Sequence, residues 1–332
     1  MNGKDCRKRR KTIATVQTVT DPIDTSEMGF TLIHEHLRVR SDAVVMQWPY
    51  LYDEKREMER AIGQVRAARE RGVKTIVEPT VMGLGRDIRF MQEVGRLTSM
   101  QIIPATGLYT YNDVPFYFHN RSVDKMADLF IHDIEEGIQG TSIRATFLKC
   151  ATDEPGITPG VEQVLRAVAR AHRRTGVPIM THSHPRSGVG LKQQDILEAE
   201  GVDLSRVLIG HSGDTDDIDY LTQLVERGSF IGMDRYGLEE TAGYLSTEKR
   251  NATILEMCRR GYVEKMMLSQ DTCCTIDWFE PEVVAALAPK WNMTYITDEV
   301  IPALKAGGIT DAQIHTMTVD NPRRYFERQG AY

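Results

Sequence analysis

The strongest constraint on the fold is a repeated alternation between short apolar runs and longer segments with helical spacing. The runs are rich in Val, Ile, Leu and Met with little polar alternation, which is typical of strands buried on both faces of a sheet. In chain order they are FTLIHEHL, KTIVEPT, MQIIPATGLY, RATFLKCAT, GVPIMTHS, RVLIGHSG, SFIGMDR and KMMLSQD. Eight strand–helix units in one chain of 332 residues predict the α/β class and a (β/α)8 TIM barrel.

The segments between the runs carry apolar residues at helical spacing. In the clearest case, residues 161–175, the apolar positions follow an i, i+3, i+4, i+7 track, and a glycine stands at the expected C-cap. An open doubly wound sheet is the alternative architecture, but the chain has no GxGxxG after an early strand and no P-loop motif. The other predicted helices span residues 57–71, 86–98, 124–137, 192–200, 217–227 and 249–260.

No linker divides the chain in two. Residues 19–332 are therefore predicted to form a single barrel domain, preceded by a basic, frayed N-terminal tail over residues 1–18. After the eighth run, residues 272–292 are predicted to form a long irregular loop, a candidate lid or substrate wall, with helices following it.

Composition and charge exclude several classes of partner. The formal net charge is −6, and no basic stripe occurs beyond the tail, which argues against a nucleic-acid partner. No run of 18 apolar residues occurs, so no membrane partner is expected. The five cysteines form an odd set without a CxxC pair, which favours a reducing, cytoplasmic location over a secreted disulfide framework.

Polar residues stand at the carboxyl end of every predicted strand, where the active sites of such barrels lie. Four of the nine histidines of the chain are among them. From the first strand to the eighth, these residues are His34 and His36, Glu78, Tyr109, Lys149, His182, His211, Asp234 with Arg235, and Asp271.

His34 and His36 are two residues apart, so on a strand both side chains point to the same face, here the barrel interior, with Glu35 on the other side. Two imidazoles that converge in an apolar interior suit a divalent metal, although two hydrogen-bonded core histidines would have the same spacing. The three further groups expected at the same depth, His182, His211 and Asp271, favour the metal site.

Lys149 ends a buried strand, where an unpaired ammonium group would be costly. Beside two cations its pKa would fall, and the neutral amine could react with carbon dioxide to give an anionic carbamate that bridges two metals. An ordinary ion pair with an acid such as Asp271 explains the position equally well, and Lys149 alone does not separate the two hypotheses.

Several long motifs resemble one known family. TLIHEHL, ATGLYTYNDVPFYF, LKCATDEPGITPGVE, THSHP, IGHSGDTDD, GMDRYGL and SQDTCCTIDW occur in the order found in the phosphotriesterase-like lactonases of the amidohydrolase superfamily, and the likeness covers residues 19–329. The resemblance implies a homodimer and a binuclear centre. His34, His36 and Asp271 would hold the buried ion, His182 and His211 the exposed one, and carbamylated Lys149 with a hydroxide would bridge two divalent ions, zinc first, then cobalt, iron or manganese.

The resemblance also implies a reaction. The bridging hydroxide would open the lactone ring of N-acyl-homoserine lactones, which quenches quorum sensing, with weak phosphotriesterase activity. Tyr109 would point its hydroxyl at the substrate carbonyl or at the bridging hydroxide, an oxyanion-type role, or else pack in the core with its hydroxyl satisfied. Asp271 would carry the proton to the leaving alkoxide. A dedicated phosphotriesterase or arylesterase is the alternative enzyme. A catalytically inactive barrel that binds a signal or a partner is the alternative outside enzymes.

Two more residues match pocket residues of that family. Arg235 would line the pocket, or else pair with its neighbour Asp234. Trp278 would wall the channel for an acyl chain, or else serve as a packing anchor of its loop. Gln270 departs from the family pattern, which commonly has histidine before the metal-binding aspartate, and this puts the proton path behind Asp271 in question.

Overall fold

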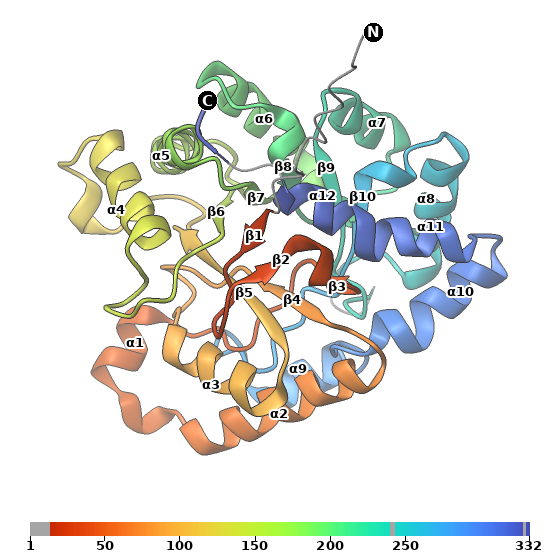
Figure 1. Cartoon of the computed structure of the whole chain (residues 1–332), viewed down its shortest axis with the longest axis horizontal. Helices are drawn as coiled ribbons and strands as arrows, with labels where there is room; N and C mark the ends of the chain where they lie inside the picture. The colour runs from red at the N-terminus through yellow and green to blue at the C-terminus, as the bar shows by residue number, and fades with distance from the viewer. Residues whose placement is uncertain (1–13, 240–242, 328–329) are drawn as a thin grey trace, which may run out of the picture.

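The computed structural model describes residues 14–239, 243–327 and 330–332. Eight parallel strands pair in the order β10-β9-β8-β7-β6-β5-β4-β3 and lie at the centre of the molecule, with the helices around them (Figure 1). The strands are β3 (Thr31–Leu32), β4 (Thr75–Glu78), β5 (Gln101–Gly107), β6 (Phe147–Ala151), β7 (Ile179–His182), β8 (Val207–Ile209), β9 (Phe230–Met233) and β10 (Met266–Leu268). Each lies within one of the eight predicted runs.

The sheet closes where β3 meets β10. The amide of Ile33 donates to the carbonyl of Leu268 (3.5 Å), and that of Asp271 donates to the carbonyl of His34 (3.0 Å). His36 and Cys273 then form a parallel bridge beyond the strand ends. The fold is therefore a (β/α)8 barrel, as predicted.

The predicted helices are all present, with ends shifted by a few residues. Helix α5 shows why they begin and end where they do: the Thr158 side chain accepts from the amide of Val161 at the start, and Gly176, at φ 78°, closes the other end. The helices between strands are α2 (Glu54–Glu70), α3 (Ile88–Thr98), α4 (Val123–Glu135), α5 (Pro159–Thr175), α6 (Val189–Ala199), α7 (Ile218–Glu226) and α8 (Thr247–Arg259).

Some elements were not predicted, whereas the helices expected after residue 292 are present. A short antiparallel hairpin, β1 (Thr15–Val16) with β2 (Ile23–Asp24), begins inside the predicted tail, whose basic cluster lies outside the described residues. Helix α1 (Asp42–Gln47) follows β3. The segment 272–292, predicted to be irregular, contains α9 (Pro281–Leu287), which begins at a proline in the first helical turn. Helices α10 (Ile301–Ala306), α11 (Asp311–His315) and α12 (Asn321–Glu327), with π-helical turns at Ile296–Val300 and Thr316–Asp320, complete the chain.

Apolar side chains fill the part of the barrel nearest the amino-terminal ends of the strands. Phe147 and Met180 belong to a fully buried cluster inside the strands, and Phe326 of α12 closes it from the amino-terminal end. The rings of Phe147 and Phe326 meet edge to face with centroids 6.1 Å apart. Because these apolar side chains block the amino-terminal end, the described polar groups inside the barrel are accessible only from the carboxyl ends of the strands. No helix of the described chain is long and apolar enough to cross a bilayer.

Candidate metal centre

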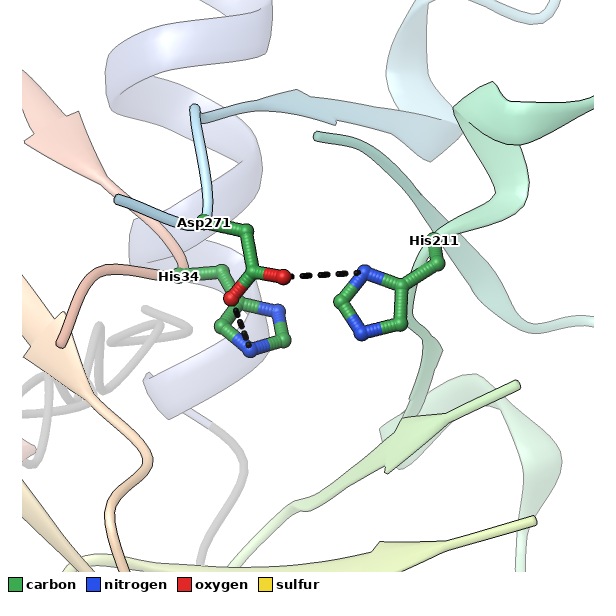
Figure 2. A group of neighbouring side chains, drawn as sticks. All are labelled: His34, His211 and Asp271. Atoms are coloured by element: carbon green, nitrogen blue, oxygen red, sulfur yellow. Dashed lines mark ion pairs between the residues drawn. The ribbon is translucent and has the colours of Figure 1, made fainter. Parts of the chain in front are cut away.

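His34, His36 and Asp271 meet inside the barrel mouth. Oδ1 of Asp271 lies 3.3 Å from Nε2 of His34 and 3.3 Å from Nε2 of His36. Figure 2 shows the Asp271 carboxylate between His34 and His211, whose Nδ1 lies 3.7 Å from Oδ2. One ligand atom from each of His34, His211 and Asp271 lies within 4.8 Å of the other two, so these three residues could hold a metal ion.

Glu35 points away from this group, as the strand alternation predicted. Its buried carboxylate accepts hydrogen bonds from Ser269 Oγ (2.6 Å) and from the amides of Gln270 (2.8 Å) and Thr272 (2.7 Å). Burial raises the pKa of Glu35 to about 8 despite these bonds. Because the bonded amides flank Asp271, Glu35 fixes the backbone that carries that ligand.

Lys149 extends into the same interior. Its Nζ lies 3.1 Å from Nε2 of His34, and no ion pair joins it to Asp271 among the described residues. Burial lowers the pKa of Lys149 to about 8. The neighbouring strand comes close because β5 ends in Gly107, at φ 142°, where a Cβ atom would stand 1.9 Å from the Lys149 carbonyl oxygen.

His182 and His211 face each other across the second part of the site. Nδ1 of His182 lies 2.9 Å from Nε2 of His211 and 3.0 Å from the hydroxyl of Tyr109. Burial lowers the pKa of His182 to about 4 and lowers that of His211 as well. Both imidazoles are therefore neutral near pH 7, the form that binds metals.

In each of the four histidines the outer ring nitrogen, the one that faces away from the site, lies near a side-chain oxygen; the contact is a hydrogen bond in His36, His182 and His211 and a 3.3 Å approach without a hydrogen bond in His34. The pairs are His34 Nδ1 with Asp234 (3.3 Å), His36 Nδ1 with Thr80 (2.7 Å), His182 Nε2 with Asp153 (2.5 Å) and His211 Nδ1 with Asp234 (2.9 Å). Sequence reasoning assigned no function to Thr80 or Asp153, although Asp153 lies in the quoted motif LKCATDEPGITPGVE.

These pairs give a test of whether a cation fits. A carboxylate at the outer nitrogen holds the proton there, so the inner nitrogens of His182 and His211 both present lone pairs, 2.9 Å apart. Two facing lone pairs repel, and a bound cation would relieve the repulsion. The donor set of imidazole nitrogens, a carboxylate and Lys149 therefore fits divalent metal ions, without selecting one metal.

Backbone strain is concentrated at this site. Five described residues other than glycine have positive φ, and three of them are predicted site residues: His211 (58°), Arg235 (61°) and Asp271 (53°). They follow β8, β9 and β10. A non-glycine residue in this conformation costs about 1–3 kcal/mol and persists only where its surroundings fix it, which is common at active sites.

Arg235 does not form the pair with Asp234 considered as an alternative. Its Nε donates to Oδ2 of Asp271 (3.1 Å), and its guanidinium also donates to Asp214 (2.9 Å). Asp234 instead accepts from the ring and the backbone amide of His211. The left-handed backbone of Arg235 turns its side chain toward Asp271.

One cavity of about 640 Å³ is lined by all nine residues to which the sequence assigned a site role: His34, His36, Tyr109, Lys149, His182, His211, Arg235, Asp271 and Trp278. Trp278 stands at its mouth, 41% exposed, with its ring centroid 6.2 Å from that of Tyr109. One wall is apolar and includes Leu84, Ile276, Phe279, Val284 and Leu287, the last two from α9. The candidate metal ligands lie buried at the base, and the apolar wall lines the cavity toward solvent together with exposed polar residues such as Glu154 and Arg186.

A barrel with converging histidines and an aspartate at its carboxyl end is the architecture of a metal-dependent hydrolase. The family model of the phosphotriesterase family matches residues 14–326. The chain belongs to this family, whose members are metal-dependent hydrolases.

Relatives extend the likeness over nearly the whole chain. An aryldialkylphosphatase from Saccharolobus solfataricus is 54% identical over 308 residues, 92% of this chain and 97% of that protein. A phosphotriesterase homology protein from Mycobacterium tuberculosis is 50% identical, over 96% of this chain and 99% of its own. The solved structure of the phosphotriesterase from Mycobacterium tuberculosis is 49% identical and matches with a TM-score of 0.92, covering 96% of this chain and 100% of that one.

Proposed function

We propose that this protein hydrolyses the lactone ring of N-acyl-homoserine lactones, a quorum-quenching activity, with weak phosphotriesterase activity beside it. The observation that carries the proposal is the division of the cavity into a polar base and an apolar wall formed by the segment around Trp278 and by α9. A substrate with a small hydrolysable ring and a long alkyl tail matches both parts.

In this proposal two divalent ions occupy the base, with zinc as the first choice and cobalt, iron or manganese as alternatives. His34, His36 and Asp271 would hold one ion, His182 and His211 the other, and Lys149 would bridge them as a carbamate. The neutral amine that carbamate formation requires is favoured because burial lowers the pKa of Lys149 to about 8. When bound, such ions lower the pKa of water and polarise a carbonyl group.

The chain's own residues then position the substrate and move the proton. Burial raises the pKa of Tyr109 well above its usual value, so its hydroxyl stays protonated and can donate to the oxygen that becomes negative during attack. Burial opposes ionisation of Asp271, but its neighbours His34, His211 and Arg235 outweigh this and hold its pKa well below the usual range. Asp271 is therefore ionised and can accept the proton of the attacking water and pass it to the leaving alkoxide.

The test is the ratio of kcat/KM for lactones with C4 to C12 chains to kcat/KM for paraoxon, using metal-loaded protein. Efficient lactone opening that is lost in Asp271→Asn supports the proposal. Rapid paraoxon hydrolysis with lactones at background would overturn it.

A dedicated phosphotriesterase or arylesterase is the second candidate, and the 54% identical relative named aryldialkylphosphatase favours it. The same hydroxide chemistry can attack phosphorus, but an aryl dialkyl phosphate offers the apolar wall short alkyl groups and an aryl group rather than one long alkyl tail. Metal-loaded protein without activity on either substrate would indicate an inactive binding barrel instead.

We also propose a homodimer. Met46, Tyr50 and Leu51, on α1 and the turn after it, are 78%, 79% and 60% exposed, and Trp48 beside them is 49% exposed. An apolar patch of this kind is typical of a protein interface. Light scattering should give about twice the chain mass of 37.6 kDa, and Tyr50→Asp with Leu51→Asp should give monomers. A monomeric wild-type protein would contradict the proposal.

We propose a cytoplasmic location, supported by the cysteines. Cys150, Cys258, Cys273 and Cys274 are free thiols in the described chain. A reducing compartment keeps such thiols intact. Cell fractionation that places the protein outside the cytoplasm would contradict this.

A further inference from the structure

Asp153 lies in the loop after β6, at the edge of the candidate metal centre. Its two carboxylate oxygens have different partners: Oδ1 accepts from the amide of Glu154 (2.7 Å), and Oδ2 lies 2.5 Å from Nε2 of His182. The Asp153 carbonyl also accepts from the amide of Gly156 (2.8 Å). The turn therefore fixes the carboxylate, and the carboxylate in turn holds the outer edge of the His182 ring.

This contact decides which nitrogen of His182 faces the site. With the ring proton held on Nε2, Nδ1 carries the lone pair and points to Nε2 of His211 (2.9 Å) and the Tyr109 hydroxyl (3.0 Å). His182 is the exception among the four histidines, since the other three have their outer partners at Nδ1.

We propose that Asp153 is a positioning residue that orients His182 and thereby sets the affinity for the more exposed metal ion alone. The inference rests on the proposed binuclear site. The selectivity follows from the contacts: Asp153 holds only His182, whereas Asp234 contacts both His34 and His211 and so supports both ions.

The test compares Asp153→Ala and Asp153→Asn with wild-type protein loaded with zinc. Zinc per chain is measured after dialysis against a series of competing chelator concentrations, which gives two dissociation constants. Loss of a carboxylate that holds a metal-binding histidine typically weakens metal binding by about 10- to 100-fold, so Asp153→Ala should lose one ion early and keep the other at wild-type affinity. Asp153→Asn keeps an oxygen acceptor for the Nε2 proton of His182, so its affinity for the exposed ion should lie between that of the wild type and that of Asp153→Ala.

Glu154→Gln is the matched control, because Glu154 is the next residue and its carboxylate is 80% exposed, 3.9 Å from His184. It should bind both ions as the wild type does. In the cobalt-loaded protein, the visible absorption of one ion should change in Asp153→Asn while that of the other is preserved, which a general loss of stability would not produce.

The outcomes separate this inference from the proposed function. A wild-type chain that binds no zinc overturns the binuclear site itself. A wild-type chain with two ions, and Asp153 variants with unchanged affinity for both, overturns the positioning role only. Equal weakening of both ions, together with a lower melting temperature of the metal-free variants, would assign Asp153 a merely structural role and also overturn it.

Discussion

Truncation of Trp278 should remove the preference for long acyl chains without impairing the reaction itself. Each methylene moved from water to an apolar wall contributes about 0.8 kcal/mol. The four methylenes between a C4 and a C8 chain therefore set an upper limit of about 3 kcal/mol, or roughly 200-fold in kcat/KM. Trp278 is 41% exposed and shares the wall with α9, so we assign it a part of this limit, about 1–1.5 kcal/mol, or roughly 5- to 12-fold.

The assay is kcat/KM against chain length from C4 to C12 for wild type, Trp278→Ala and Trp278→Phe. The Ala variant should lose its advantage at C8 and above while C4 is unchanged, and Phe should restore part of it. Tyr117→Ala is the control, because Tyr117 is a similarly exposed aromatic residue (45%) that does not line the cavity. An equal fall at every length, C4 included, would refute the reasoning and show that Trp278 acts on the reacting centre or on loop structure.

Three other measurements follow from the geometry. Lys149→Met removes the only bridging side chain proposed and should lower zinc content below two ions per chain, and a variant that retains both would contradict the bridge. Burial lowers the pKa of His172 to about 4, below the 6.5 of the unfolded chain. The unfolded state therefore binds a proton below pH 6.5 that the folded state refuses until about pH 4, and the free energy of unfolding falls as pH drops from 6.5 to 4. This decrease in the free energy of unfolding is about 3 kcal/mol. His172→Gln should remove it, as measured by urea titrations at a series of pH values. Wild-type and variant curves of unfolding free energy against pH that run parallel would contradict this. Tyr52→Phe deletes a 2.7 Å hydrogen bond to Asp277 and should speed hydrogen exchange across residues 272–280, and unchanged exchange would show that the loop is held elsewhere.

The sequence was sufficient to predict the barrel and the place of its polar residues. A strand buried on both faces must be an apolar run, so polar residues at its end stand out, as His182 and His211 do after GVPIMT and RVLIG. The i, i+2 spacing of His34 and His36 likewise fixes their common face, and both are found in the barrel interior.

Partners distant in the chain could not be predicted in the same way. The contact between Asp153 and His182 depends on how the loop after β6 folds back over β7, which no local pattern encodes. The positive φ of Arg235 belongs to this class too, because a non-glycine residue gives no sign of it. That conformation turns Arg235 to Asp214 and Asp271, so the neighbour in sequence was the wrong partner to consider.

Gln270, which stands where the family commonly has histidine, has a structural role in this protein. Its side-chain Nε2 donates to the carbonyl of Asn292 (3.0 Å), and its own carbonyl accepts from the indole of Trp291 (3.0 Å). Both contacts lie at the far end of the segment that begins after β10 and contains α9, so Gln270 ties the end of that segment back to its origin. Oδ2 of Asp271 is held by Arg235 instead. Gln270, which put the proton path behind Asp271 in question, therefore supports the wall of the cavity, and the charge beside Asp271 comes from Arg235.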